Sequence, residues 1–202
     1  MQIDSDLLES AIKKQSTEPV FRLYGWQPKC ISLGRNQKED FLSKYKGEKI
    51  DCVRRLTGGR ALLHDDEITY SYISPVSAIP SGETIVLSYK YISGILINFF
   101  KTLGVELNFG ENKKVSTRYD YCMLLSTGAD VCYQGKKIIG SAQYRKEGYI
   151  LQHGSILFGY DKQLLESLFQ EEVKGIITVK EILPDISKEE LVQAIEHYVS
   201  QL

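Results

Sequence analysis

Two apolar runs flank Lys146-Glu147-Gly148 within residues 136–158. Apolar runs around a short glycine-containing turn predict a β-hairpin. Side chains alternate between the two faces of a strand, so the adjacent Lys136 and Lys137 are expected on opposite faces. Only one of these two lysines can therefore point into the protein.

Apolar residues at helical spacing predict four helices. Asp4 or Ser5 is expected to cap the first and Ser81 or Thr84 the second. The fourth carries a capping box, with a serine at its start and a glutamate three residues later. The helices are expected at residues 5–14, 84–103, 161–169 and 186–201, with a further helix at 39–45.

Shorter apolar segments between turn residues predict strands. Besides the hairpin, they are expected at residues 21–26, 30–33, 50–55, 60–64, 68–74, 105–109 and 129–133. A turn at Gln27-Pro28-Lys29 is expected to join the first two. Strands in clusters, with helices between and after them, are typical of an α+β fold with a mixed or antiparallel sheet and flanking helices. We expect a single domain over residues 1–202, with 161–202 as its C-terminal helical portion.

The charge balance does not favour a nucleic acid partner. Lys+Arg 25 against Asp+Glu 26 leaves a net charge of -1, so there is no global basic field. The most apolar segment, residues 85–100, is interrupted by polar residues, which argues against a membrane span. The first residues, MQIDSD, lack the order of a signal peptide. We therefore expect a cytoplasmic protein without a membrane partner.

The four cysteines are widely spaced, and with no CxxC pair and only three histidines the chain lacks the spacing of a zinc site. No metal is expected. Cys30, Cys52 and Cys132 lie in apolar, strand-like runs, where a cysteine is expected to be buried and inert. Cys122 differs, because it follows the polar run 111–120.

A glycine pair, Gly58-Gly59, lies between the strands expected at 50–55 and 60–64. Adjacent glycines let a backbone approach a ligand closely, and Arg54, Arg55 and Arg60 surround the bend with guanidinium groups. This combination indicates a site for an anionic ligand. The alternative is an ordinary glycine hairpin with solvated arginines, which an isolated glycine pair favours.

Cys122 and Lys137 form a candidate catalytic pair. A thiol becomes a nucleophile when a nearby cation stabilises its thiolate, and Lys137 is the candidate cation. The alternatives are a packing cysteine, a solvated lysine and, for His64 and His153, hydrogen-bonded structural histidines.

Four ordered motifs resemble the biotin/lipoate protein ligase superfamily. They are FRLYGWQPKCISLGRNQ at 21–37, RRLTGGRALLHDDEITYS at 54–71, GKKIIGSAQ at 135–143 and LQHGSIL at 151–157. Within the superfamily the chain is most similar to the cysteine-dependent octanoyltransferases of lipoate assembly. Cys122 matches the position of their nucleophile, and Lys137 matches the lysine that favours its thiolate.

This resemblance implies a fold like that of the biotin/lipoate ligase catalytic domain and an acyl transfer reaction. The octanoyl group would move from acyl carrier protein, through a thioester on Cys122, to the lysine of a lipoyl domain. The acceptor would be the glycine cleavage H protein or the E2 component of a 2-oxoacid dehydrogenase. No cofactor is implied.

Residues of the glycine bend and of the hairpin are expected to bind the substrate. The acyl chain needs a narrow apolar slot, with walls expected from residues 56–64 and 138–142 and His64 near the reacting end. The arginines are expected to meet the phosphopantetheine arm or an acidic carrier surface. The expected substrate-binding set is Arg54, Arg55, Thr57, Gly58, Gly59, Arg60, His64, Gly140, Ser141, Ala142, His153 and Gly154.

Residues 123–130 depart from the pattern of these transferases, which leaves other functions open. One is an ATP-dependent lipoate ligase, which would require ATP and Mg²⁺. A second is an amidotransferase that moves octanoyl from one lipoyl domain to another. A third is a non-catalytic protein that binds lipoyl domains.

Overall fold

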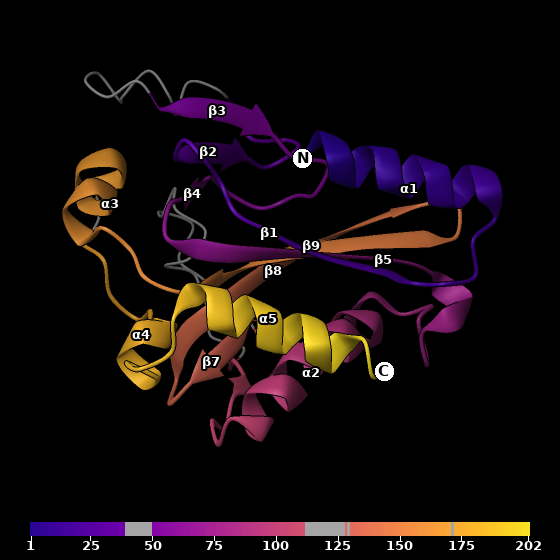
Figure 1. The fold of residues 1–202 in the computed structure, drawn as a ribbon. Coiled ribbons are helices and arrows are strands. Elements are labelled where there is room, and N and C mark those ends of the chain that lie inside the picture. Colours follow the sequence, from indigo (N-terminus) through magenta and orange to yellow (C-terminus); the bar gives the residue numbers. More distant parts are fainter. Residues whose placement is uncertain (39–49, 112–127, 129, 171) are drawn as a thin grey trace.

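A computed structural model describes residues 1–38, 50–111, 128, 130–170 and 172–202. Their centre is a six-stranded antiparallel sheet, and a three-stranded sheet lies beside one of its faces (Figure 1). The strand order is β1-β5-β9-β8-β7-β6 in the large sheet and β3-β2-β4 in the small one. The strands are β1 (Val20–Tyr24), β2 (Cys30–Leu33), β3 (Asp51–Arg54), β4 (Leu62–His64), β5 (Glu67–Pro75), β6 (Asn108–Phe109), β7 (Val131–Tyr133), β8 (Lys136–Lys146) and β9 (Tyr149–Leu157).

Helices cover both faces of the large sheet (Figure 1). Helices α2 (Ile85–Thr102) and α5 (Lys188–Val199) pack on one face, and α1 (Gln2–Lys14) lies on the other face beside the small sheet. The short helices α3 (Lys162–Phe169) and α4 (Val179–Ile182) follow β9, and a 3₁₀ turn at Val76–Ala78 follows β5. The predicted α+β class, with an antiparallel sheet and flanking helices, is confirmed.

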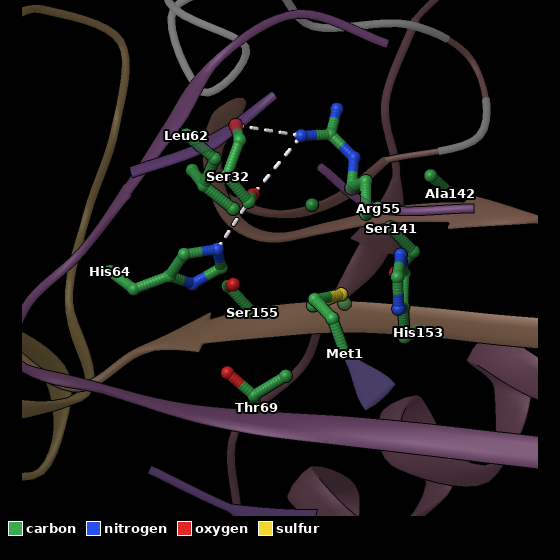
Figure 2. Close-up of a pocket in the computed structure, with 12 residues that line it drawn as sticks. Met1, Ser32, Arg55, Leu62, His64, Thr69, Ser141, Ala142, His153 and Ser155 are labelled. Atoms are coloured by element: carbon green, nitrogen blue, oxygen red, sulfur yellow. Dashed lines mark hydrogen bonds between the residues drawn. The ribbon is translucent and has the colours of Figure 1, made fainter. Parts of the chain in front are cut away.

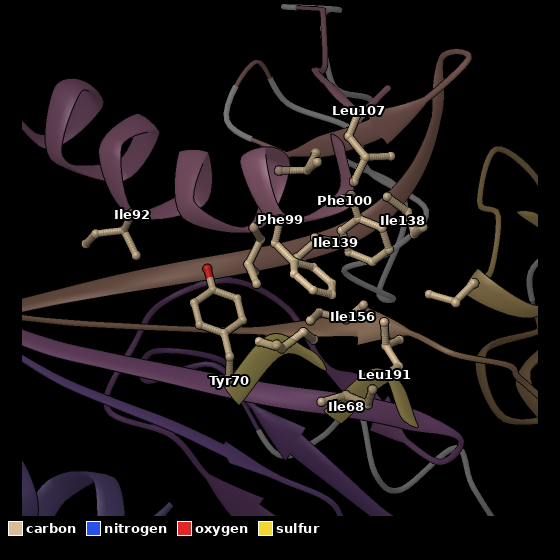
Figure 3. Packing of buried hydrophobic residues seen from close by; sticks show 14 of the residues in the cluster. Ile68, Tyr70, Ile92, Phe99, Phe100, Leu107, Ile138, Ile139, Ile156 and Leu191 are labelled. Carbon is tan, nitrogen blue, oxygen red and sulfur yellow. The ribbon is translucent and has the colours of Figure 1, made fainter. Parts of the chain in front are cut away.

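The main apolar core lies between the large sheet and the helices α2 and α5. Phe99 and Phe100 of α2 pack there with isoleucines of β8 and β9 and with Leu191 of α5 (Figure 3). Burial of such side chains is the largest favourable contribution to folding. A second cluster joins the small sheet to α3, and a third joins α1 to β5 and β9. Both smaller clusters are on the side of the sheet that carries the candidate site.

The hairpin and the alternation of its two lysines are confirmed. Strands β8 and β9 pair in register, and Glu147 and Gly148 form the turn with φ angles of 48° and 79°. Two positive φ angles are typical of the two-residue turns that match strand twist. Lys137 is buried and Lys136 is exposed.

The helix at 84–103 corresponds to α2, which Thr84 caps, and the capping box at Ser187 and Glu190 begins α5. The predicted cap of the first helix was wrong. That helix begins at Gln2, and Asp4 is a buried residue of its first turn. Helix α4, with its own capping box at Thr178 and Glu181, was not predicted. The helix expected at 39–45 lies outside the described residues.

The small sheet rules out the hairpin that was the alternative for the glycine bend. Strands β1 and β2 are close in sequence, yet they belong to different sheets. Strands β3 and β4 do not pair with each other, because β2 lies between them, parallel to β3 and antiparallel to β4. The glycine bend is therefore a crossing over the end of β2 and not a hairpin.

Two of the three described cysteines meet their expectation. Cys30 and Cys132 are buried, whereas Cys52 is exposed because β3 is an edge strand of the small sheet. Among the helices that the structure describes, none is both long enough and apolar enough to cross a bilayer.

Candidate functional site

A cavity lies between the two sheets, where the glycine bend faces the β8–β9 hairpin (Figure 2). The large sheet provides small residues and short polar side chains, and the small sheet provides a serine, a leucine and a histidine. The residues that line the cavity are Met1, Ser32, Arg55, Leu62, His64, Thr69, Gly140, Ser141, Ala142, His153, Gly154 and Ser155.

His64 is fixed on three sides. Its Nδ1 lies 2.6 Å from Oε1 of Glu67, and its Nε2 lies 2.7 Å from the hydroxyl of Ser32. The indole of Trp26 stacks on the imidazole with ring centroids 4.1 Å apart, and Trp26 donates to Thr69 at 2.9 Å. This histidine therefore has no rotational freedom at the cavity wall.

Glu67 is a buried carboxylate with three hydrogen-bond partners on one oxygen. Thr69 donates to Oε1 at 2.6 Å and Ser155 at 2.7 Å, in addition to the contact with His64. Burial opposes the charged form, but His64 and the two hydroxyls outweigh it and hold the pKa of Glu67 below its usual value. A glutamate within an apolar strand was the sequence signal that could have identified this residue.

Arg55 is buried and donates to main-chain oxygens on both sides of the bend. It donates to Ser32 O at 3.0 Å, to Gly58 O at 2.8 Å and to Arg60 O at 2.7 Å, and its Nη1 also lies 3.1 Å from Ser32 Oγ. The guanidinium, expected to meet an anion, thus organises the backbone of the bend.

The bend approaches the end of β2 at very short range. A Cβ on Gly34 would lie 1.9 Å from Gly59 O, so only glycine fits there. Arg54 donates to the carbonyls of Gly34 and Gln37 at 2.9 and 2.7 Å. Its guanidinium therefore holds the loop after β2 and is not part of the cavity lining.

His153 lies at the opposite end of the cavity from His64 (Figure 2). Its Nε2 lies 2.7 Å from the hydroxyl of Thr57 in the bend. Its Nδ1 lies 3.8 Å from Asp4 Oδ2, and no described residue lies within hydrogen-bonding distance of this nitrogen. Burial lowers the pKa of His153, and the nearby Asp4 carboxylate opposes that shift only in part.

Asp4 connects α1 to this end of the site. Arg22 and Tyr24 each donate to its carboxylate at 2.7 Å. Burial raises the pKa of Asp4, but His153 and Tyr24 outweigh it, and the pKa falls to about 2. The sequence suggested a helix cap here, so this ionic role was missed.

The hairpin wall is built from small residues. A Cβ on Gly154 would lie 2.4 Å from Ser141 Oγ, 2.6 Å from Gly140 O and 2.7 Å from a ring carbon of Tyr70. Ser141 and Tyr70 share a hydrogen bond of 2.8 Å across the sheet. Glycine at 154 thus lets β9 pack closely against Ser141 and Tyr70 on the neighbouring strands.

Lys137 is held elsewhere on β8 and is not among the lining residues. Its Nζ lies 2.9 Å from Asp130 Oδ1, and both side chains are buried. Its main-chain N–H donates to Gly175 O at 2.9 Å, and its carbonyl accepts from Ile177 at 3.0 Å. Cys122, the predicted partner of Lys137, lies outside the described residues.

The cavity brings together seven of the twelve predicted binding residues: Arg55, His64, Gly140, Ser141, Ala142, His153 and Gly154. Thr57, Gly58 and Arg60 contact these residues without lining the cavity, and Gly59 meets Gly34. Ile138, expected in the wall, belongs instead to the main core. Leu62 lies in the wall segment expected at 56–64 and lines the cavity. The sequence missed Met1, Ser32, Thr69 and Ser155 of the lining and the carboxylates Glu67 and Asp4 behind it, because only the fold carries them to the site.

The described residues contain no group of three or more histidine, cysteine or acidic side chains that could hold a metal ion. The cavity lining consists of hydrogen-bonding side chains and apolar surfaces. Such a site can bind and orient an extended apolar chain with a polar end.

Two solved structures with the same fold are described as lipoate protein ligases. A T. acidophilum protein described as a lipoate protein ligase, with bound lipoic acid, has a TM-score of 0.77 at 22% identity and covers 100% of this chain and 80% of that one. Lipoate-protein ligase A bound with ATP gives a TM-score of 0.74 at 22% identity, covering 100% of this chain and 80% of that one. At this identity the match establishes the fold.

The family model of the lipoyl protein ligase A/B catalytic domain matches residues 1–200, and the chain belongs to this family. Octanoyltransferase LipM of Clostridioides difficile is 40% identical over 176 residues, which are 84% of this chain and 65% of that protein. LipM of Macrococcus caseolyticus is 40% identical over 179 residues, covering 84% and 64%. The match therefore spans slightly less than two thirds of these relatives.

Proposed function

We propose that this chain carries the catalytic domain of an octanoyltransferase of protein lipoylation. The observation that carries the proposal is its 40% identity, over 84% of its length, to proteins named octanoyltransferase LipM. The cavity lined by Gly140, Ala142 and Gly154 supports it, because its lining combines small residues with hydrogen-bonding side chains.

The proposed donor is octanoyl-acyl carrier protein and the proposed nucleophile is Cys122. Its thiolate attacks the carbonyl carbon of the donor thioester, a new C–S bond forms, and the carrier thiol leaves with a proton. The lysine amine of a lipoyl domain then attacks the enzyme thioester. An amide forms, the amine loses a proton, and the Cys122 thiolate is released.

Lys137 is the proposed cation that favours this thiolate. Its buried ammonium is paired with Asp130 at 2.9 Å, so the charge is held in one position within β8. A fixed donor near a developing negative charge contributes about 3 kcal/mol to catalysis, so Lys137→Met is expected to reduce the rate by a factor of about 100. The proposed reaction needs no cofactor.

Intact-mass measurement after incubation with octanoyl-acyl carrier protein alone tests the proposal. The expected result is one added octanoyl group, which Cys122→Ala abolishes. Cys52→Ser is the matched control, because the Cys52 thiol is exposed on β3, and it should be acylated like the unchanged protein.

Three other outcomes would replace the proposal. Acyl transfer that requires lipoate, ATP and Mg²⁺, without a covalent enzyme adduct, would identify a ligase. Acylation of Cys122 by an octanoylated lipoyl domain, but not by carrier protein, would identify an amidotransferase. Complex formation with a lipoyl domain, and no modification of either protein, would identify a non-catalytic binder.

A further inference from the structure

A chain of four polar side chains crosses from the large sheet to the glycine bend. It runs from Glu67 of β5 through His64 of β4 and Ser32 of β2 to Arg55, with separations of 2.6, 2.7 and 3.1 Å. Each of the four side chains is at most 6% exposed. Three of the four residues also line the cavity (Figure 2).

One arrangement of protons gives every donor in this chain an acceptor. The ionised Glu67 can only accept, so His64 carries its proton on Nδ1. In this arrangement the Nε2 of His64 accepts a hydrogen bond from the hydroxyl of Ser32. Arg55 can only donate, and Ser32 Oγ accepts from it at 3.1 Å. Each hydrogen-bond donor in the chain then has an acceptor. The direction of each hydrogen bond is set by its neighbour in the chain.

The order serine, histidine and acid is that of a hydrolytic triad, but Ser32 is unsuited to attack. Its side chain is 0% exposed, in the middle strand of the small sheet. Its oxygen already accepts from the Arg55 guanidinium, which reduces its nucleophilicity. The arrangement therefore holds Arg55 and does not activate the serine.

Arg55 connects this hydrogen-bonded chain to the glycine bend. Its Nε and Nη2 donate to Gly58 O, and Nη2 also donates to Arg60 O. These two carbonyls lie on either side of Gly59, whose own carbonyl lies against Gly34. The position of the guanidinium thus sets the conformation of residues 57–60, which lie behind the cavity wall and contact the lining residues Arg55 and His153.

We propose that Glu67, His64 and Ser32 are positioning residues that act through Arg55 to preform the glycine bend for acyl substrate binding. The identity of the substrate rests on the proposed octanoyltransferase function, whereas the positioning itself does not. A preformed bend lowers the ordering cost of binding, so its loss should affect substrate affinity more than the chemical step.

Hydrogen exchange of the backbone amides in residues 55–61, measured by mass spectrometry on the full chain, tests the positioning. Ser32→Ala is expected to accelerate exchange there about tenfold, because it removes one of the two acceptors for Nη1 and the donor to His64. Exchange in β5 and β9 should stay unchanged and reports whether the fold is intact. Ser71→Ala is the matched control, since Ser71 is equally buried and its hydroxyl has no partner among the described residues.

Steady-state kinetics with octanoyl-acyl carrier protein provides the second readout. Ser32→Ala is expected to raise KM about tenfold and to change kcat less than about twofold. Ser32→Thr, which restores a hydroxyl, should recover most of the exchange protection and most of the KM.

Unchanged exchange at 55–61 in Ser32→Ala overturns the positioning, whether or not the protein transfers octanoyl groups. If Ser32→Ala does not fold, Glu67→Gln replaces it, because the amide keeps the shape and removes the charge. A loss of kcat by more than about a hundredfold in Ser32→Ala, with KM unchanged, would instead make Ser32 a nucleophile. A protein that lacks octanoyl transfer but shows the exchange effect would refute only the proposed function.

Discussion

The two histidines that line the cavity share burial but differ in their partners. His64 is 2% exposed and His153 is 5% exposed. His64 has a partner on each ring nitrogen, whereas His153 has Thr57 on Nε2 and, among the described residues, none on Nδ1. Each ring has a carboxylate nearby. Glu67 Oε1 lies 2.6 Å from Nδ1 of His64, and Asp4 Oδ2 lies 3.8 Å from Nδ1 of His153. The comparison separates a rigid end of the site from an end that is sensitive to protonation.

The largest expected effect on stability comes from removing the hydrogen bonds at the His64 end of the site. Glu67→Ala removes the acceptor of His64, Thr69 and Ser155, and is expected to lower the free energy of unfolding by about 3–5 kcal/mol. Denaturant titration measures the loss. The exposed Glu189→Ala is the control and should change stability by less than about 0.5 kcal/mol. An equal effect of the two substitutions would refute the role of Glu67.

Gly154→Ala tests the packing beside His153. The added methyl group would overlap Ser141, Gly140 and Tyr70, all at less than 3.0 Å, and should lower the free energy of unfolding by about 3 kcal/mol. Gly94→Ala in α2 is the matched control, because its Cβ would meet nothing within 4 Å. That substitution is expected to stabilise the protein by about 1 kcal/mol. Thermal unfolding measures both variants. A change of melting temperature in the same direction for both would contradict the close packing at Gly154.

Asp4→Asn tests the ionic support of the His153 end. The pKa of Asp4 is about 2 in the folded protein against 3.8 ordinarily, which corresponds to about 2 kcal/mol of stability at neutral pH. A lowered pKa means that this contribution is complete above pH 4 and is lost as the pH falls toward 2. Unfolding measured from pH 7 to pH 2 should show the two proteins converging. A constant difference would argue against the charge as the cause.

The smallest effect distinguishes the two histidines directly. Burial lowers the pKa of His153, so the folded protein protonates this ring at a lower pH than the unfolded chain, in which a histidine titrates near pH 6.5. Stability is therefore complete above pH 6.5 and falls below it, by up to about 1.4 kcal/mol at pH 5.5. His153→Gln should remove this part of the pH dependence. An unchanged pH profile would show that His153 does not titrate on unfolding.

The sequence predicted those elements whose partners are neighbours along the chain. The hairpin at β8 and β9, with its turn at Glu147 and Gly148, depends on alternation and on a local turn. The capping boxes and the apolar stripe of α2 are equally local signals. The motifs also predicted that the glycine bend and the hairpin contribute to one site. The structure places Arg55, His64 and five residues of the hairpin around one cavity.

Contacts between distant segments could not be predicted in this way. Alternation in β3 and β4 is compatible with a hairpin, and only the insertion of β2 between them excludes one. Asp4 is 149 positions from His153, and nothing in its neighbourhood indicates that its carboxylate faces that ring. The Arg55 guanidinium was expected to meet an anion, because charge is visible in a sequence whereas the carbonyls of Gly58 and Arg60 are not.

The sequence by itself determined the α+β class, the hairpin, the caps of α2 and α5, and the family through its four motifs. The tertiary structure decided which charged side chains are hydrogen-bonded within the protein and which face the cavity. The reason is physical: hydrophobic periodicity and capping act over a few residues, whereas the partner of a buried charge is chosen by whichever distant segment the packed sheets bring within 3 Å. Glu67, His64, Ser32 and Arg55 form one connected chain only because β5, β4 and β2 meet around one cavity.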